Sequence, residues 1–303
     1  METRQALLVD AFADEPLAGN PAGVVPEAEG LTADQMRAVA SELGASETGF
    51  VLPATDSDAD RRLRFFSPER EVDLCGHATV AAHAALAERG VVEDGQHTMA
   101  TEAGVFEVET KENGMVWMEQ GEADIRTVDL DEQRVADALG LDVATLRDVG
   151  ADLPLSVADT GVPWLVVPVN YFEHLGSIDP DVTAIEELCR AVDAEGIYPF
   201  TFDTISGRST LHGRAFAPLA GIAEDPVTGT AAGACGAYIR RHGAIDSTVE
   251  QVVVEQGHFI DRPGTVTVDT DGLEVWIGGR GVTSLSGDIT VPPAAEDDDI
   301  IEI

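Results

Sequence analysis

The sequence has little positive charge and a single lysine, Lys111. Its 303 residues include 56 acidic and 18 basic side chains, which gives a formal net charge of −38 at pH 7. Nucleic-acid binding depends on clustered Lys and Arg, so this balance predicts no nucleic-acid partner. Because the acidic residues are spread along the whole chain, we interpret them as a solvated surface suited to high salt, as in halophilic proteins. A surface that binds basic partners is the alternative.

Cysteines, aromatic residues and long apolar runs are also scarce. Cys75, Cys189 and Cys235 form no CxxC pair and no disulfide framework, which suits a reducing cytoplasm. No apolar run approaches the ~20 residues that cross a membrane, and the first residues lack the apolar core of a signal peptide. The sequence therefore predicts a cytoplasmic protein without a membrane partner.

What the sequence does contain is an internal repeat. Gly19–Pro26 matches Gly161–Pro168 at G-x-P-x-x-V-V-P, and Gly76–Leu86 matches Gly229–Ile239 at one glycine, three alanines and an aliphatic end. Three further pairs recur in the same order: RFFSP with RAFAP, EAGVF with EQGHF, and NGMVWM with DGLEVWI. Five matches in one order predict a duplicated domain with two similar halves, because a solenoid would have a far shorter period.

Each half is rich in short strands and carries one helix of glycine and alanine. These helices, expected at residues 76–89 and 229–242, have small residues on most faces, and a helix that is apolar all round is buried. The sequence therefore predicts an α+β fold of two pseudo-symmetric halves, each a β-barrel-like sheet around a central helix. Outer helices are expected at residues 32–43, 131–140, 142–148 and 181–195, with Thr32 and Asp181 as N-caps.

The repeat also predicts how the chain divides. We expect the first half to cover residues 1–125 and the second half to cover residues 126–282. A strand near residues 283–292 is a candidate to return to the first half. Residues 294–303 form an acidic tail that we expect to fray.

Both predicted central helices begin with glycine after an irregular, acidic lead-in. The second lead-in, EDPVTGT, places Asp225 and the hydroxyl of Thr230 beside Gly229. The first turn of a helix carries unpaired N–H groups and partial positive charge, and glycine lets a ligand approach them. Two such helix mouths facing each other would bind a small carboxylate. In the alternative interpretation the small residues serve packing alone, and Asp225 is an N-cap.

Four stretches resemble the PhzF-like proteins of phenazine biosynthesis, which have the diaminopimelate-epimerase-like fold. The stretches are VDAFADEPLAGNPAGVV (Val9–Val25), SETGFV (Ser46–Val51), DLCGHAT (Asp73–Thr79) and EDPVTGTAAGA (Glu224–Ala234). They cover nearly the whole chain in the order and spacing of the family. The resemblance implies two similar halves, each a barrel-like sheet around a central helix, and a homodimer.

The resemblance also implies catalytic roles. Glu47 in SETGF matches the acid/base that moves a proton on the substrate, and His77 in CGHAT matches a histidine at the first helix mouth. Asp225 matches the aspartate that positions the substrate and holds His77 or a substrate proton. Without the resemblance, Glu47 would be a loop or capping-box acid and His77 a helix-end residue bound to a local carbonyl.

Further matches concern binding, and one position departs from the wider fold. Gly76 and Gly229 would supply helix-mouth amides, and Thr230 a hydroxyl where the family often has serine. Epimerases of the wider fold use two opposed cysteine thiols, one at each mouth. Here Cys75 stands at the first mouth but Thr228 at the second, so a two-thiol racemase is not expected.

Other polar residues are expected to be structural. Asn20 in GNP is expected to form a turn rather than a contact. His83 and Cys235 are expected in the core. His212 and His258 are weaker candidates to line the site, and we leave them out of the predicted set.

Together these residues predict a cofactor-independent isomerase acting on a small cyclic or unsaturated carboxylic acid. Glu47 would remove a proton from carbon and return it elsewhere, while helix-mouth amides, Thr230 and His77 stabilise negative charge. The sequence has no dinucleotide fingerprint and no metal-ligand spacing, so no cofactor and no metal are expected. Two alternatives stay open: an amino-acid epimerase or racemase with Asp225 as second base, and a metabolite-binding protein that has lost the reaction.

Overall fold

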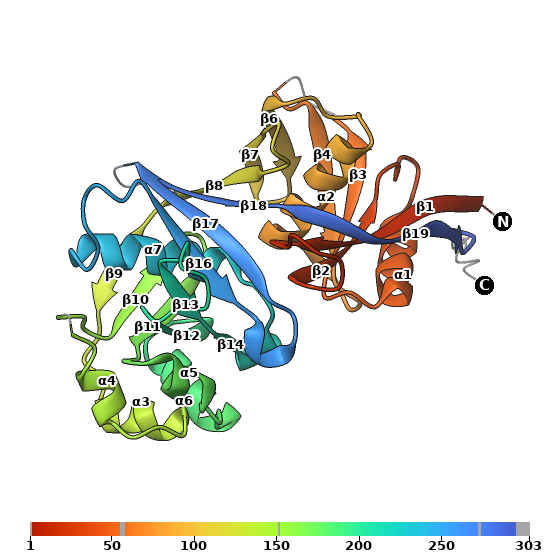
Figure 1. Cartoon of the computed structure of the whole chain (residues 1–303). Coiled ribbons are helices and arrows are strands. Elements are labelled where there is room, and N and C mark those ends of the chain that lie inside the picture. Colours follow the sequence, from red (N-terminus) through yellow and green to blue (C-terminus); the bar gives the residue numbers. More distant parts are fainter. Residues whose placement is uncertain (1, 55–57, 151, 272–273, 295–303) are drawn as a thin grey trace, which may run out of the picture.

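Strands predominate in the fold, and two central helices run through it (Figure 1). The computed structural model describes residues 2–54, 58–150, 152–271 and 274–294. The predicted α+β class is confirmed. Among the described residues, no helix is long and apolar enough to cross a membrane. Residues 295–303 of the predicted tail lie outside the described residues.

The first half surrounds helix α2 (Gly76–Glu88) with strands, and helix α1 (Ala33–Leu43) packs outside them (Figure 1). Its strands are β1 (Glu2–Ala11), β2 (Asn20–Val25), β3 (Thr48–Pro53), β4 (Arg61–Phe66), β5 (Glu71–Val72), β6 (Gly95–Thr101), β7 (Gly104–Thr110) and β8 (Val116–Glu122). The half is completed from the far end of the chain, because β19 (Gly281–Val291) pairs antiparallel with β1.

The second half surrounds helix α7 (Gly229–Arg241) in the same way. Its strands are β9 (Asp124–Thr127), β10 (Ser156–Asp159), β11 (Pro163–Pro168), β12 (Gly196–Thr201), β13 (Leu211–Gly213), β14 (Ala215–Ala217), β15 (Ile222–Asp225), β16 (Gln251–Gln256), β17 (Gly264–Asp271) and β18 (Glu274–Gly279). Helical segments on its outside are α3 (Glu132–Ala138), α4 (Ala144–Arg147), α5 (Phe172–Gly176) and α6 (Val182–Ala191), with 3₁₀ turns η1 (Pro218–Ala220) and η2 (His258–Ile260).

The strand pairings follow the same order in both halves. β2 pairs parallel with β3 as β11 does with β12, and β4 pairs parallel with β6 as β13 does with β16. The short strands β5 and β15 occupy equivalent places, each antiparallel to the strand before it. This matched topology agrees with the two pseudo-symmetric halves inferred from the sequence, whereas the duplication event itself stays a prediction.

The two halves are joined by an antiparallel pair, β8 with β18. After β8 the chain crosses over, and β9 pairs with β10 of the second half. After β18 it crosses back, and β19 pairs with β1 of the first half. The first crossover lies close to the boundary expected after residue 125, and the second supplies a strand where one was expected near residues 283–292.

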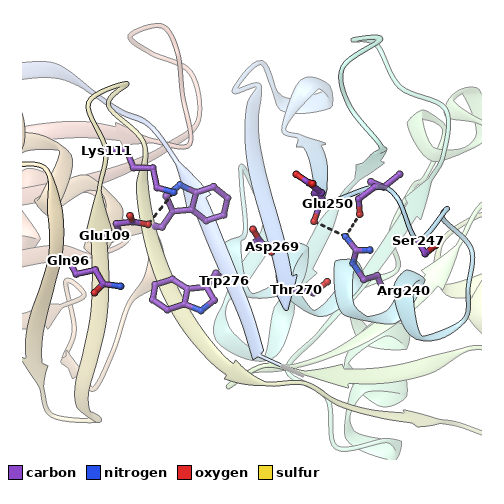
Figure 2. Close-up of a pocket in the computed structure, with 11 residues that line it drawn as sticks. Gln96, Glu109, Lys111, Arg240, Ser247, Glu250, Asp269, Thr270 and Trp276 are labelled. Carbon is purple, nitrogen blue, oxygen red and sulfur yellow. Dashed lines mark hydrogen bonds and ion pairs between the residues drawn. The ribbon is translucent and has the colours of Figure 1, made fainter. Parts of the chain in front are cut away.

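A cavity of about 580 Å³ lies on one side of this junction (Figure 2). Lys111 stands over the ring of Trp117, 5.2 Å from its centre. On the opposite side of the cavity, Arg240 donates to the backbone carbonyls of Val249 and Glu250 (Figure 2). Trp276 of β18 also lines the cavity, whereas the next residue, Ile277, contacts the starts of both central helices. Successive side chains of a strand point to opposite faces, so the cavity and the helix starts lie on opposite sides of β18.

Small residues allow the central helices to lie inside their sheets. The stretch from Ala78 to Leu86 of α2 is buried throughout. In α7, a Cβ on Gly236 would lie 2.8 Å from Cγ1 of Val268, and one on Gly233 would lie 3.2 Å from Cγ2 of Ile277. A larger residue at these positions would push strand and helix apart, which explains why glycine occurs inside a helix.

Helices α1, α3 and α6 begin within one residue of the predicted positions, whereas α4 begins at Ala144 rather than at residue 142. Helix α3 ends at Ala138 rather than at residue 140. Thr32 caps α1 in a capping box with Gln35, and the Asp181 carboxylate accepts from the N–H of Ala184 at the start of α6. Helix α6 ends at Ala191 rather than at residue 195. The chain turns there because Asp193 adopts a left-handed conformation, with φ of 50°. Helix α5 was not predicted.

We predict that Gly236→Ala lowers the free energy of unfolding by about 1 kcal/mol. Overpacking against Val268 costs about 1–3 kcal/mol and outweighs the roughly 0.5–1 kcal/mol that alanine gains over glycine in a helix. Gly76→Ala is the matched control, because the nearest atom to a new Cβ there is 4.0 Å away. Urea unfolding of both variants measures the effect, and an equal or smaller loss in Gly236→Ala would contradict the packing explanation.

A second prediction concerns His83, which is fully buried in α2. Its Nδ1 lies 3.0 Å from the carbonyl of Thr79, and its Nε2 lies 3.4 Å from Arg61 Nη1. Burial lowers the pKa of His83 from 6.5 to about 4. The unfolded chain therefore binds an extra proton between pH 6.5 and 4, and stability falls as the pH falls through this window, by up to about 3 kcal/mol.

We expect His83→Gln to remove this part of the acid dependence. Unfolding free energies at several pH values between 4 and 7 give the slope for each protein. A wild-type slope retained in the variant would show that His83 is not the group responsible.

Candidate active site

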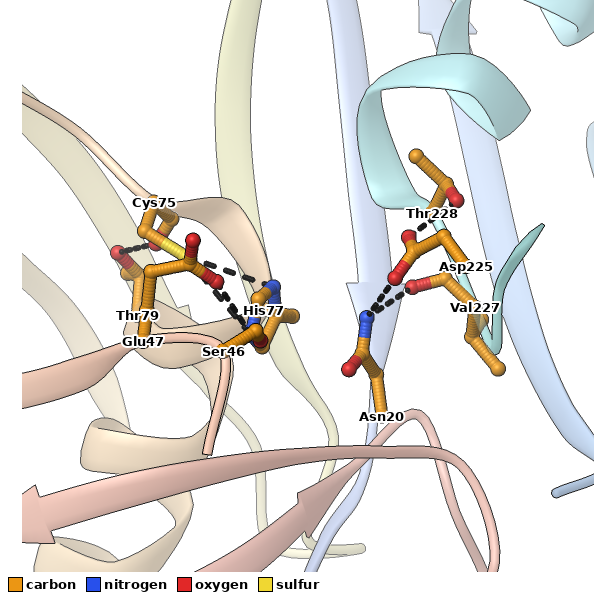
Figure 3. A network of polar contacts seen from close by, with 9 residues as sticks. All are labelled: Asn20, Ser46, Glu47, Cys75, His77, Thr79, Asp225, Val227 and Thr228. Carbon is orange, nitrogen blue, oxygen red and sulfur yellow. Dashed lines mark hydrogen bonds and ion pairs between the residues drawn. The ribbon is translucent and has the colours of Figure 1, made fainter. Parts of the chain in front are cut away.

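An acid, an imidazole and a thiol meet at the start of α2 (Figure 3). Cys75 is the N-cap residue, and its Sγ lies 3.4 Å from Nδ1 of His77. The other ring nitrogen of His77, Nε2, lies 3.4 Å from Oε2 of Glu47 and 3.4 Å from the hydroxyl of Ser46. Glu47 stands just before β3, where its carbonyl accepts from the N–H of Gly23. Its side chain is 21% exposed and that of His77 is 13% exposed, so both keep access to a ligand.

Cys75 is the buried member of this group. Burial raises the pKa of the Cys75 thiol well above its usual value, and the negative charge of Glu47 raises it further. Hydrogen bonds from the N–H groups of His77 and Ala78 oppose these effects. A thiol in this environment stays protonated at neutral pH, so Cys75 is not a ready nucleophile.

A half-buried aspartate, Asp225, lies at the second mouth (Figure 3). Asn20 Nδ2 donates to Asp225 Oδ1 at 2.9 Å, and the hydroxyl of Thr228 donates to Asp225 Oδ2 at 2.5 Å. Asn20 also donates to the carbonyl of Val227. The expectation that Asn20 forms a turn rather than a contact is therefore wrong. Its amide comes from the first half and fixes the acid of the second.

Gln256 holds the same mouth with four hydrogen bonds, and this role was not predicted from the sequence. Its Oε1 accepts from the N–H of Thr228 and the hydroxyl of Tyr198, both at 3.2 Å. Its Nε2 donates to the carbonyl of Asp225 at 2.9 Å and to the hydroxyl of Thr228 at 3.1 Å. Because Gln256 donates to that hydroxyl, the Thr228 proton points to Asp225. One signal was present: the repeat places Gln256 opposite Ala103, so only the second half has an amide there.

The predicted binding residues lie at the two helix starts. A Cβ on Gly229 would lie 2.5 Å from Cδ1 of Ile277, and one on Gly76 would lie 4.0 Å from the same atom. The two glycines therefore flank one residue of β18. Thr230 takes a different direction from the one expected, since its hydroxyl accepts from the indole N–H of Trp164 at 3.1 Å. The hydroxyl beside Asp225 belongs to Thr228.

Charges couple the two mouths into one site. Burial raises the pKa of Asp225, His77 lowers it, the hydrogen bonds from Thr228 and Asn20 also lower it, and Glu47 raises it. The structure thus brings together the three residues expected to be catalytic. It pairs His77 directly with Glu47, whereas Asp225 acts on His77 through its charge.

The remaining histidines and Cys235 have structural surroundings. Cys235 is fully buried in α7, as expected. His212 is also fully buried, with Nδ1 3.2 Å from Glu255, and its ring lies against those of His258 and Phe172. We therefore assign His212 and His258 to packing in the second half.

Comparison with known proteins shows a full-length relationship. Residues 9–287 match the family described as "Phenazine biosynthesis-like protein". The "uncharacterized isomerase YfhB" of Bacillus subtilis is 36% identical over 274 residues, which cover 89% of this chain and 91% of that protein. A crystal structure of a PhzF-family protein from Bacillus anthracis superposes with a TM-score of 0.87 at 34% identity, covering 96% of this chain and 100% of that one.

The fold extends to more distant enzymes. A hydroxyproline epimerase from Agrobacterium vitis superposes with a TM-score of 0.63 at 15% identity, covering 95% of this chain and 92% of that one. At this level of identity the likeness shows the fold alone. It confirms the predicted epimerase-like architecture.

We predict that Gln256→Leu lowers the free energy of unfolding by about 1–3 kcal/mol. The change removes the hydrogen-bond partner of the buried Tyr198 hydroxyl, of the N–H of Thr228 and of the carbonyl of Asp225. Gln251→Leu, at the exposed start of the same strand, is the matched control and should change stability by less than about 0.5 kcal/mol. Denaturant unfolding compares the two, and equal losses would rule out a special role for the Gln256 amide.

Proposed function

The chain belongs to the phenazine biosynthesis-like (PhzF) family, and on this premise we propose that it is a cofactor-independent isomerase. Its substrate would be a small cyclic or unsaturated carboxylic acid, bound between the starts of α2 and α7. The observation that carries the proposal is the pairing of Glu47 with His77 at one mouth, opposite Asp225 at the other (Figure 3).

Glu47 is the group proposed to move the proton. It is partly exposed, as an acid that must reach a substrate carbon has to be, and His77 Nε2 at 3.4 Å orients its carboxylate. The carboxylate takes a proton from a carbon next to the substrate's acid group and returns it to another carbon. The first-turn N–H groups of α2 and α7 stabilise the negative charge that forms in between.

Asp225 is proposed to position the substrate. Asn20 and Thr228 each donate to one of its oxygens, so the carboxylate is fixed in orientation. Its remaining lone pairs can accept a hydrogen bond from an amino or hydroxyl group of the substrate. This favours an amino or hydroxy acid as the substrate class.

A second candidate function is epimerisation at one carbon. Glu47 and Asp225 project from opposite helix mouths (Figure 3). Two bases on opposite faces of one carbon are what a two-base epimerase requires. The two hydrogen bonds to Asp225 make the first candidate the stronger, because they favour its charged form and hold the carboxylate in one orientation.

Hydrogen exchange in D₂O tests the proposal. The protein is incubated with a panel of small cyclic and unsaturated amino and hydroxy acids, and NMR follows deuterium entering carbon positions. We expect exchange with at least one compound and a loss of at least about 100-fold in Glu47→Gln, because general acid–base catalysis contributes about 10²–10⁴-fold. Glu42→Gln, an exposed glutamate at the end of α1, is the matched control and should exchange at the wild-type rate.

The position of the label separates the two candidate reactions. Deuterium at a carbon other than the one that lost its proton indicates isomerisation, and deuterium with inversion at the same carbon indicates epimerisation. Exchange that survives in Glu47→Gln and disappears in Asp225→Asn would overturn the assignment of Glu47.

A further inference from the structure

Three different metal-ligand types meet at the first helix mouth. One ligand atom each from Glu47, Cys75 and His77 lies within 4.8 Å of the other two. The sequence did not reveal this group, because Glu47 lies 28 residues before Cys75 and shares no ligand spacing with it. The proposed isomerase reaction uses the acid and the imidazole but leaves the thiol without a role.

The distances suit one ion held on one side of the histidine ring. His77 Nε2 lies 3.4 Å from Glu47 Oε2 and 3.9 Å from Cys75 Sγ. Tetrahedral zinc, with bonds of about 2.0–2.2 Å to N and O and about 2.3 Å to S, separates its ligand atoms by roughly 3.3–3.6 Å. The nitrogen–oxygen separation fits. The sulfur has to move toward the other two ligand atoms, because the three atoms lie within 4.8 Å of one another rather than within 3.6 Å.

We propose that Glu47, Cys75 and His77 form a zinc-binding site and that bound zinc inhibits the enzyme. A thiolate, an imidazole and a carboxylate select a borderline-soft cation over Mg²⁺ or Ca²⁺. On binding, the ion displaces the proton of the Cys75 thiol to solvent and coordinates the thiolate. Cys75 lies at the back of the site, while the partly exposed Glu47 and His77 give access to the ion, and water takes the fourth position.

Inhibition follows from what the ion occupies. Zinc uses a lone pair of the Glu47 carboxylate, which would otherwise take the substrate proton, and it also engages the ring nitrogen that orients this carboxylate. This consequence rests on the proposed function, whereas zinc binding itself does not. Cys75 thereby acquires a role as the residue that makes the site sensitive to zinc.

Cobalt provides a direct test of binding. Titration of the intact protein with Co²⁺ should produce a thiolate-to-cobalt charge-transfer band that saturates at one ion per chain. The buffer contains sulfate rather than chloride, because chloride competes for the metal. Zn²⁺ should abolish the band by displacement. Cys75→Ser should lose the band and weaken Zn²⁺ binding by at least about 10-fold. Cys189→Ala, at a buried cysteine of α6, is the matched control and should keep both.

A second variant covers the case in which Cys75→Ser does not fold. His77→Gln should weaken Zn²⁺ binding by a similar factor, and circular dichroism shows whether each variant is folded. Absence of the band in the wild type, or a band of unchanged intensity in folded Cys75→Ser, would overturn the site. An unchanged Zn²⁺ affinity in folded His77→Gln would exclude the histidine as a ligand and overturn the three-residue site as well.

The effect on the enzyme is measured separately. Zn²⁺ should stop deuterium exchange, and the zinc concentration that halves the exchange rate should match the dissociation constant for zinc. In Cys75→Ser this concentration should be at least about 10-fold higher, with each rate expressed as a fraction of that variant's rate without zinc. Zinc that binds without slowing exchange would overturn the inhibition. If no compound exchanges at all, the proposed function fails, while the cobalt and zinc titrations still decide the metal site.

Discussion

The rest of the structure depends on the antiparallel pairing of β8 with β18. This pair joins the two halves, and the chain crosses from one half to the other directly after each of its strands. Ile277 of β18 lies beside the first residues of both central helices, Gly76 and Gly229. The two helix mouths therefore meet on one side of a shared ribbon, where their N–H groups and partial positive charges act on the same space.

The two halves share a topology but carry different polar residues at their helix mouths. The first mouth carries Glu47, Cys75 and His77, the residues of the proposed proton transfer and of the proposed zinc site, and two of these are partly exposed. The second mouth carries Asp225, whose oxygens accept from Asn20 and Thr228 and whose backbone carbonyl accepts from Gln256. In the proposed site, Asp225 can hold the substrate in place while the partly exposed Glu47 moves a proton. The asymmetry thus follows from different residues at equivalent positions of similar halves.

Much of the fold was predictable because the signals are local. The starts of α2 and α7 were placed at Gly76 and Gly229 by a run of small residues that only a buried helix explains, and both were confirmed. The early end of α6 was not predictable, because it depends on the left-handed conformation of Asp193 rather than on a glycine or proline. Salt dependence and dimerisation are properties of the surface and stay predictions.

The sequence by itself determined which types of residue stand at each helix mouth. His77 directly follows Gly76, and Asp225 lies four residues before Gly229. Only the tertiary structure decided which of them make contact. Asn20 reaches Asp225 across 205 residues, a pairing that no local pattern contains. Thr228, the N-cap with an extended backbone, donates its hydroxyl to Asp225, whereas Thr230, inside the first turn of α7, accepts from the indole of Trp164. Local propensity determines elements, whereas the packing of one half against the other determines the partners of each polar group.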